Sequence, residues 1–236
     1  MIYKNNPLFS FIRVACHVNE VEKIFNYLDE IKKLKIKLII NLMQISEFDD
    51  YQINNIVKKL AKRNVDVIYF ADSLGCMNAR DVANITRKIK KNFKKDVGFH
   101  AHDNLNNAHK NVYAAVKNRV MWIDSTIYGF GRGAGNAKTE YLLNKNFFAK
   151  NNLVNNYAIK KLINKRFLKL KEKYAWGYNK YYKLSAKFKI HPTYIQEIIK
   201  KNISDNKFLN IINLLKKQNT KLYDKNLLNN IMSINK

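Results

Sequence analysis

Short apolar runs rich in β-branched residues alternate with amphipathic segments along the first 130 residues. The runs are nearly continuous in hydrophobic residues, which is typical of strands buried in a parallel sheet. The intervening segments carry apolar residues at helical spacing, such as Val21, Ile24 and Leu28, and each has room for one helix. This pattern predicts five parallel βα units, in either a doubly wound sheet or a piece of a (β/α)8 barrel. The predicted strands are Phe11–Cys16, Leu38–Met43, Val67–Asp72, Val97–His102 and Trp122–Ile127.

The pattern becomes almost wholly helical from about residue 148. His191-Pro192-Thr193 is typical of a helix entry, and the apolar positions from Phe208 to Leu215 predict a further helix. No low-complexity linker separates the two parts, so we expect an α/β domain over residues 1–147 and an all-helical extension over residues 148–236. One face of the first helix of that extension is formed by Ile159, Leu162, Ile163, Phe167, Leu170 and Tyr174.

Composition places the chain among globular proteins. Of its 236 residues 47% are hydrophobic, and no apolar run approaches the ~18–20 residues of a membrane span. The amino-terminal residues lack the pattern of a signal peptide. Cys16 and Cys76 are too few to form a disulfide framework, so a cytoplasmic location without a membrane partner is expected.

The net charge is strongly positive. Forty-four lysines and arginines against 18 acidic residues give +26, a balance that is typical of nucleic-acid-binding proteins. The lysine pairs are spread along the whole chain, which favours a solvated basic surface over a dedicated nucleic-acid site. A basic nucleic-acid-binding module without catalysis is the alternative of another functional class.

Glycine is rare except at one place. Of seven glycines, four lie in the segment Tyr128–Asn136, directly after the fifth predicted strand. Since α/β folds place their sites at the carboxyl ends of strands, this loop is a candidate ligand-binding element. The four glycines are Gly129, Gly131, Gly133 and Gly135.

Polar residues gather at the same ends of other strands. His100 and His102 are two positions apart, so both imidazoles face one side of the fourth strand and can share a divalent ion. Asp72 and Ser73 end the third strand, and Asn136 closes the glycine-rich loop. Each of these three also has an ordinary structural interpretation, as a helix cap or a loop-bonding amide.

Several reactive residue types receive structural interpretations. Cys16 is expected in the core and His109 on an exposed helix surface, and His191 is expected to fix a turn. No predicted strand contains a lysine, although Lys37 comes just before the second, which disfavours a Schiff-base aldolase.

Three segments together resemble the pyruvate-processing, metal-dependent TIM-barrel lyases, a superfamily that includes 4-hydroxy-2-oxovalerate aldolase, hydroxymethylglutaryl-CoA lyase and isopropylmalate synthase. They are Val67–Gly75, Val97–Asn104 and Asp124–Glu140. Arg13–His17 also resembles the fourth barrel strand of the aldolase branch. The resemblance implies a partial (β/α)8 TIM barrel, with the five units equivalent to strands 4–8, followed by the helical extension.

Within the superfamily the aldolase branch matches best. The glycine-rich loop has no cysteine, whereas a lyase acting on hydroxymethylglutaryl-CoA is expected to carry one there. Gly177-Tyr178, followed by Tyr182, is similar to a stretch of the aldolases in which the first tyrosine contacts substrate. A Claisen-type acyl-CoA enzyme of the same superfamily is the second interpretation.

The resemblance implies a chemistry and a set of residues. The expected activity is divalent-metal-dependent cleavage of a 4-hydroxy-2-oxo acid, such as 4-hydroxy-2-oxovalerate, to pyruvate and an aldehyde through a metal-stabilised enolate. The metal is expected to be Mn²⁺, with Mg²⁺, Co²⁺ or Zn²⁺ as alternatives. Its predicted ligands are His100, His102 and Asn136. Ser73, His100 and Tyr178 are predicted to bind substrate, and Asp72 with the loop glycines to support the site.

One element of the family pattern is not found. The superfamily carries an Asp-x-x-x-Arg-Asp type segment on its first strand, and the residues before Phe11 do not resemble it. No catalytic acid or base is therefore predicted in this chain, which we expect to be a weak catalyst by itself. Three explanations stay open: the chain is a fragment of a longer reading frame, one half of a split enzyme, or a degenerate copy. In a split enzyme, a separate amino-terminal fragment or a homo-oligomer would complete the barrel. Some relatives have an aldehyde dehydrogenase partner, but no residue here points to one.

Overall fold

The computed structural model describes residues 9–143 and 156–234, so the predicted domain boundary at 147/148 lies outside the described residues. The chain forms two compact units. The first contains Met1–Ser73, Met77–Ala101 and Lys110–Asp124, and the second contains Leu74–Cys76, His102–His109 and Ser125–Lys236. Within the described ranges, no helix is both long enough and apolar enough to cross a bilayer.

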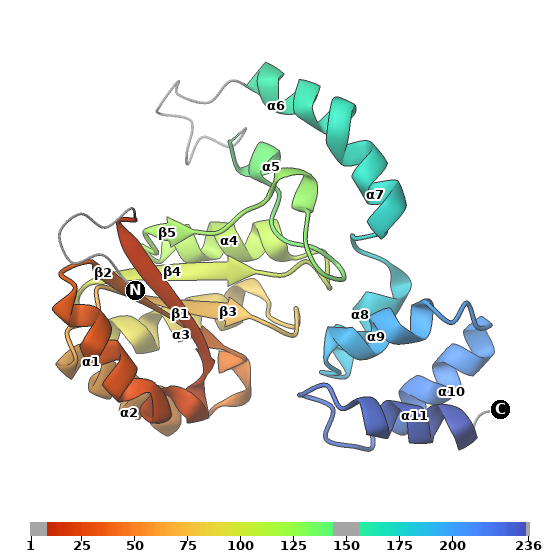
Figure 1. Ribbon diagram of the computed structural model, residues 1–236, viewed down its shortest axis with the longest axis horizontal. Coiled ribbons are helices and arrows are strands. Elements are labelled where there is room, and N and C mark those ends of the chain that lie inside the picture. Colours follow the sequence, from red (N-terminus) through yellow and green to blue (C-terminus); the bar gives the residue numbers. More distant parts are fainter. Residues whose placement is uncertain (1–8, 144–155, 235–236) are drawn as a thin grey trace. The chain divides into compact units, whose positions relative to one another are not determined.

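A five-stranded parallel sheet in the order β1-β2-β3-β4-β5 forms the centre of the first unit (Figure 1). This confirms the predicted partial α/β barrel. The strands are β1 (Phe11–His17), β2 (Lys37–Met43), β3 (Val67–Asp72), β4 (Asp96–Ala101) and β5 (Trp122–Ile123).

The fifth strand is shorter than predicted, and residues 124–127 lie outside the sheet. The backbone of Thr126 hydrogen-bonds to the segment after the glycine-rich loop instead of to β4. Its N–H donates to the Ala137 carbonyl at 3.0 Å, and its carbonyl accepts from the Thr139 N–H. β4 likewise ends at Ala101, and His102 instead forms an isolated bridge with Asn136.

One helix follows each of the first four strands. Parallel strands in consecutive order with right-handed crossovers place all these helices on the same face of the sheet. Strand residues on that face, such as Leu38, Leu42, Phe70 and Phe99, are fully buried. The helices are α1 (Phe25–Lys33, after the 3-10 segment Val18–Ile24), α2 (Asp50–Lys62, after the 3-10 segment Ile45–Glu47), α3 (Ala79–Asn92) and α4 (Ala108–Lys117).

The opposite face of the sheet, here called the inner face, is only partly covered. Phe11 on β1 is 45% exposed, and its ring meets that of Trp122 on β5 at 6.2 Å between centroids. Side chains from the first and last strands therefore meet across the inner face. This is the geometry of a sheet that curls as a barrel wall does.

The second unit is helical apart from its loops, as predicted. Pro192 opens α9, where the His191 imidazole accepts from the Thr193 N–H, so His191 fixes a helix start. The elements are the 3-10 turn Ile127–Gly129, α5 (Thr139–Leu143), α6 (Asn156–Leu162), the π-helical segment Ile163–Phe167, α7 (Leu168–Tyr174), α8 (Lys180–Lys187), α9 (Pro192–Ile199), α10 (Asp205–Leu215) and α11 (Lys225–Ile234).

The helix run Asn156–Tyr174 buries less than its pattern predicts. Of its six apolar positions on the predicted face only Ile163 is buried, whereas Leu162 is 39% and Tyr174 59% exposed. The core of this unit lies instead among α8–α11, where residues such as Tyr194, Ile198 and Ile211 have no exposed surface.

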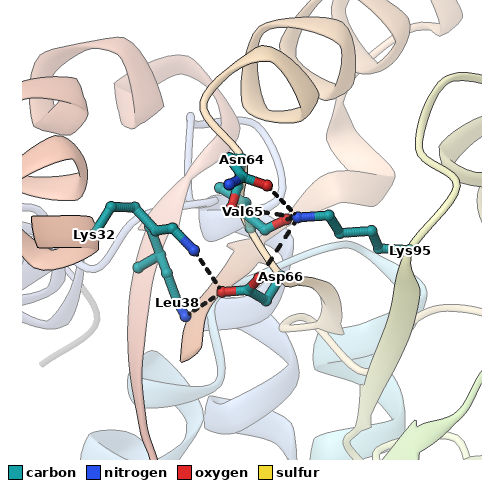
Figure 2. A network of polar contacts seen from close by, with 6 residues as sticks. All are labelled: Lys32, Leu38, Asn64, Val65, Asp66 and Lys95. Carbon is teal, nitrogen blue, oxygen red and sulfur yellow. Dashed lines mark hydrogen bonds and ion pairs between the residues drawn. The ribbon is translucent and has the colours of Figure 1, made fainter. Parts of the chain in front are cut away.

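A network of polar contacts around Asp66 connects the amino ends of β2, β3 and β4 (Figure 2). The Asp66 carboxylate accepts from the Leu38 N–H and from Lys32 Nζ, both at 2.8 Å, and Lys95 Nζ lies 3.5 Å away. Partial burial alone would raise the pKa of Asp66, but these partners, Lys32 above all, hold the pKa below its ordinary value.

Asp66 should therefore contribute stability that depends on pH. Because the folded-state pKa lies below the unfolded one, this contribution is present above about pH 4 and is lost as the pH falls through the folded pKa. Asp66→Asn should lower the free energy of unfolding by about 1 kcal/mol at pH 7 and flatten its decline between about pH 5 and 3. Urea unfolding across that range tests this, with Asp50→Asn as the control, because Asp50 is an exposed carboxylate that pairs with Lys88. An unchanged acid slope in Asp66→Asn would contradict it.

Candidate functional site

His100 has a specific carboxylate partner. Its Nδ1 lies 2.9 Å from Oδ2 of Asp124, the residue that directly follows β5. The Asp124 N–H donates to the Phe99 carbonyl at 3.1 Å, so the main chain places Asp124 beside His100 at the end of β4. This contact follows from the register of two neighbouring parallel strands.

Arg13 approaches the same carboxylate from the far edge of the sheet. Its Nη1 lies 2.9 Å from Oδ1 and 2.8 Å from Oδ2 of Asp124, and its guanidinium group lies over the Tyr69 ring at 4.7 Å. Burial acts to raise the pKa of Asp124, but the hydrogen bonds from His100 and Arg13 hold it below the ordinary value. Burial and the Asp124 charge raise the pKa of Tyr69, so its hydroxyl keeps its proton. Asp124 thus accepts hydrogen bonds from both His100 and Arg13.

The role of Arg13 was not found by sequence reasoning, which used this residue only as part of a resemblance. A signal was present: Arg13 interrupts an otherwise apolar strand at a position whose neighbours on the same face are Phe11 and Ala15. An arginine among buried strands needs an acidic partner. The pattern does not say which one, because Asp124 lies 111 residues away.

The side-chain amide of Asn136, a predicted metal ligand, forms a hydrogen bond through its nitrogen but not through its oxygen. Its Nδ2 donates to the Phe130 carbonyl at 3.0 Å, while its Oδ1 is buried and has no hydrogen-bond partner. A buried amide oxygen without a partner is costly, and such an oxygen is a good ligand for a hard divalent cation. The main chain of Asn136 forms the bridge with His102.

The glycine-rich loop can form only because side chains are absent. A Cβ at Gly131 would lie 2.4 Å from Nδ2 of Asn136, and one at Gly135, whose φ is +79°, would lie 2.3 Å from the Gly129 carbonyl oxygen. The loop therefore packs its own backbone around the Asn136 amide. Gly129 and Gly133 also adopt positive φ.

The remaining predicted residues make turn-forming bonds. Ser73 Oγ accepts from the Gln44 N–H at 3.0 Å, and the buried Asp72 carboxylate accepts from the Met77 N–H at 3.2 Å. Tyr178 is 46% exposed. Substrate contacts of Ser73 and Tyr178 stay predictions.

Cys16 and His109 are the two residues for which the sequence predicts a purely structural place in the α/β part. Cys16 is buried, which confirms its expected place in the core, and burial raises its pKa to about 11, so its thiol is not a nucleophile at neutral pH. His109 is not the exposed residue expected. Its Nε2 accepts from the Lys138 N–H at 2.9 Å and its ring stacks on Tyr141 with centroids 4.0 Å apart.

The sequence predicts two imidazoles and one amide as donors to a cation, and this ligand set stays a prediction, since His100 belongs to the first unit and His102 and Asn136 to the second. Across residues 9–143 and 156–234, no three His, Cys, Asp or Glu side chains lie close enough together to hold a metal ion. Imidazole nitrogens and an unpartnered amide oxygen fit part of the coordination shell of a divalent cation, and His100, His102 and Asn136 are the residues that would supply them.

Similarity to known proteins is concentrated in the α/β part of the chain. A 4-hydroxy-2-oxovalerate aldolase from Moorella thermoacetica is 35% identical over 132 residues, which are 56% of this chain and 39% of that protein. The enzyme of the same name from Geobacillus thermodenitrificans is 30% identical over a region of the same length. This chain thus spans about two fifths of the length of these relatives.

Solved structures show the same fold. The N-terminal domain of a proposed aldolase from Bacteroides vulgatus superposes with a TM-score of 0.72 and 30% identity, covering 84% of this chain and 66% of that one. Hydroxymethylglutaryl-CoA lyase from Pseudomonas aeruginosa shares the fold with a TM-score of 0.58, at 16% identity over 68% of this chain and 63% of that one.

The family match extends further along the chain than these pairwise alignments. The HMGL-like family matches residues 7–164, which are more than half of the 236 residues. The matched range includes all five strands, both histidines of the candidate site and the glycine-rich loop. On this evidence the chain belongs to the HMGL-like family.

Proposed function

We propose that this chain is part of a divalent-metal-dependent aldolase that cleaves a 4-hydroxy-2-oxo acid to pyruvate and an aldehyde. The observation that carries the proposal is the buried, unpartnered Oδ1 of Asn136, in a glycine-rich loop whose main chain bridges to His102. The names of the aldolase relatives support the reaction class.

The proposed metal ligands are His100, His102 and Asn136, with Mn²⁺ as the preferred ion. When bound, the ion would supply Lewis-acid stabilisation of the negative charge that develops on the 2-oxo oxygen as the carbon–carbon bond breaks. A carbanion next to a carbonyl is inaccessible at neutral pH without such stabilisation.

The chain's own residues would bind and orient the substrate. The hydroxyl groups of Ser73 and Tyr178 would donate hydrogen bonds to the carboxylate or hydroxyl groups of an oxo acid. The glycine-rich loop allows a ligand to approach the backbone closely, because four of its residues carry no Cβ.

Completion of the barrel is part of the proposal. The incompletely covered inner face and the 45% exposed Phe11 on the edge strand support a partner that covers this face. We propose that further βα units, on a separate segment or in a second copy of this chain, cover this face and supply the carboxylate ligand.

The test uses His100→Ala and His102→Ala in the completed assembly. Each variant should lose bound Mn²⁺ and lower pyruvate release by at least about 100-fold, because each removes a ligand of the ion that stabilises the transition state. Metal content by mass spectrometry and coupled pyruvate detection give the two readouts.

His191→Asn is the matched control, since asparagine can still cap α9 and the residue lies outside the proposed site. Unchanged metal content in both alanine variants would overturn the proposed ligand set. Release of free CoA from an acyl-CoA, without release of an aldehyde, would instead favour the Claisen-type reaction.

A further inference from the structure

The Asp124 carboxylate accepts hydrogen bonds from two side chains, those of His100 and Arg13. Its Oδ2 receives both the His100 Nδ1 contact at 2.9 Å and the Arg13 contact at 2.8 Å, and its Oδ1 receives Arg13 again at 2.9 Å. The side chain of Asp124 is only 22% exposed and that of His100 only 23%. Arg13 lies on β1, His100 lies on β4, and Asp124 directly follows β5. The contacts of Asp124 therefore connect the two edge strands of the sheet with β4, which carries His100.

This arrangement decides which imidazole nitrogen carries the proton. Arg13 is always charged and keeps Asp124 ionised, so that carboxylate can only accept hydrogen bonds. His100 must then donate from Nδ1, and in the neutral ring the lone pair is on Nε2. A metal ligand needs that lone pair, and a fixed partner on the other nitrogen holds the ring in orientation.

Arg13 is itself held in place. Its guanidinium group lies 4.7 Å above the Tyr69 ring, and Tyr69 is only 3% exposed. Asp124 needs such an anchor because β5 ends immediately before it and the chain turns away from the sheet at Thr126. The anchor restricts the carboxylate to the position that His100 requires.

We propose that Asp124, anchored by Arg13, is a positioning residue that fixes His100 in the Nδ1–H tautomer and so presents Nε2 to a divalent cation. The inference rests on the proposed function, in which His100 is a metal ligand. A purely structural ion pair between the sheet edges would stabilise the fold equally well, but would not determine the tautomer of His100.

The experiment compares the full chain with Asp124→Asn and Arg13→Met. Long-range ¹H–¹⁵N spectra at pH 8.5, where ordinary imidazoles are neutral, report the tautomer of His100 without any metal. Mn²⁺ titration followed by electron paramagnetic resonance reports affinity. Asp96→Asn is the matched control, because Asp96 also accepts a hydrogen bond on this sheet, from Trp122 Nε1 at 3.0 Å.

We expect the Nδ1–H tautomer in the unaltered chain and its loss in Asp124→Asn, with Mn²⁺ affinity lowered by about 10- to 100-fold. Arg13→Met should lower the affinity less, because the carboxylate stays but is less fixed. Asp96→Asn should change neither readout.

An Nε2–H tautomer in the unaltered chain, or an Asp124→Asn variant that keeps both tautomer and affinity, would overturn the proposal. If the unaltered chain binds no Mn²⁺, that result counts against the proposed function, and the tautomer comparison still decides the role of Asp124. Should Asp124→Asn not fold, a wild-type tautomer with wild-type Mn²⁺ affinity in Arg13→Met would overturn the anchoring role.

Discussion

Phe99→Ala should lower the free energy of unfolding of the first unit by about 3–5 kcal/mol. Phe99 has no exposed surface, and its ring packs against that of Phe70 with centroids 4.7 Å apart. The truncation removes this contact in the middle of a parallel sheet, where rigid strands on either side limit how far the cavity can close. Urea unfolding monitored by circular dichroism measures the loss.

The matched control is Phe9→Ala, since Phe9 is 42% exposed and should change stability by less than about 0.5 kcal/mol. Phe99→Leu should recover more than half of the loss because leucine fills most of the cavity. A loss below about 1 kcal/mol in Phe99→Ala would mean that the layer between sheet and helices is not the core of this unit.

The isolated 236-residue chain should cleave 4-hydroxy-2-oxo acids at least about 1,000-fold more slowly than the completed assembly, a difference of about 4 kcal/mol in activation free energy. Two imidazoles and an amide hold a cation weakly without a carboxylate ligand, and no three His, Cys, Asp or Glu side chains among the described residues could hold a metal ion together. The incompletely covered inner face also admits water, which weakens every electrostatic contact there.

Coupled detection of pyruvate with Mn²⁺ present, for the chain with and without an added amino-terminal barrel segment of an aldolase relative, measures the difference. His102→Ala should abolish the gain produced by the added segment. Manganese-dependent cleavage by the isolated chain at a turnover of about 10 s⁻¹ would contradict this prediction, since that is an ordinary enzymatic rate.

Local pattern was sufficient for most of the α/β fold. The runs beginning at Phe11, Leu38, Val67 and Val97 form strands whose ends lie within one residue of the predicted ends, because nearly continuous apolar runs are typical of the strands of a parallel sheet. The fifth run was predicted too long. Three of its six residues, Asp124, Ser125 and Thr126, are polar, and Thr126 bonds to the loop segment at Ala137 and Thr139 rather than to a strand.

In the helical extension, the sequence predicted the helix correctly but not which of its residues are buried. Periodicity predicted a helix through Ile159, Ile163 and Tyr174, and that helix exists, but most of the predicted face is not buried. A hydrophobic period specifies a face and not what covers it. For the same reason the interpretation of His109 was wrong: its position early in a helix was correct, but its contacts come from Lys138 and Tyr141, about 30 residues further on.

The sequence alone determined the parallel βα order, the helical second part, the paired histidines at the end of β4 and the glycine-rich loop, because each depends on neighbours within a few residues. Only the tertiary structure decided that Arg13 reaches Asp124 across the inner face, that Asp124 bonds to His100 and that Asn136 Oδ1 lacks a partner. These contacts depend on how strongly the sheet curls and where its last strand ends. Both are set by long-range packing, which no local pattern encodes.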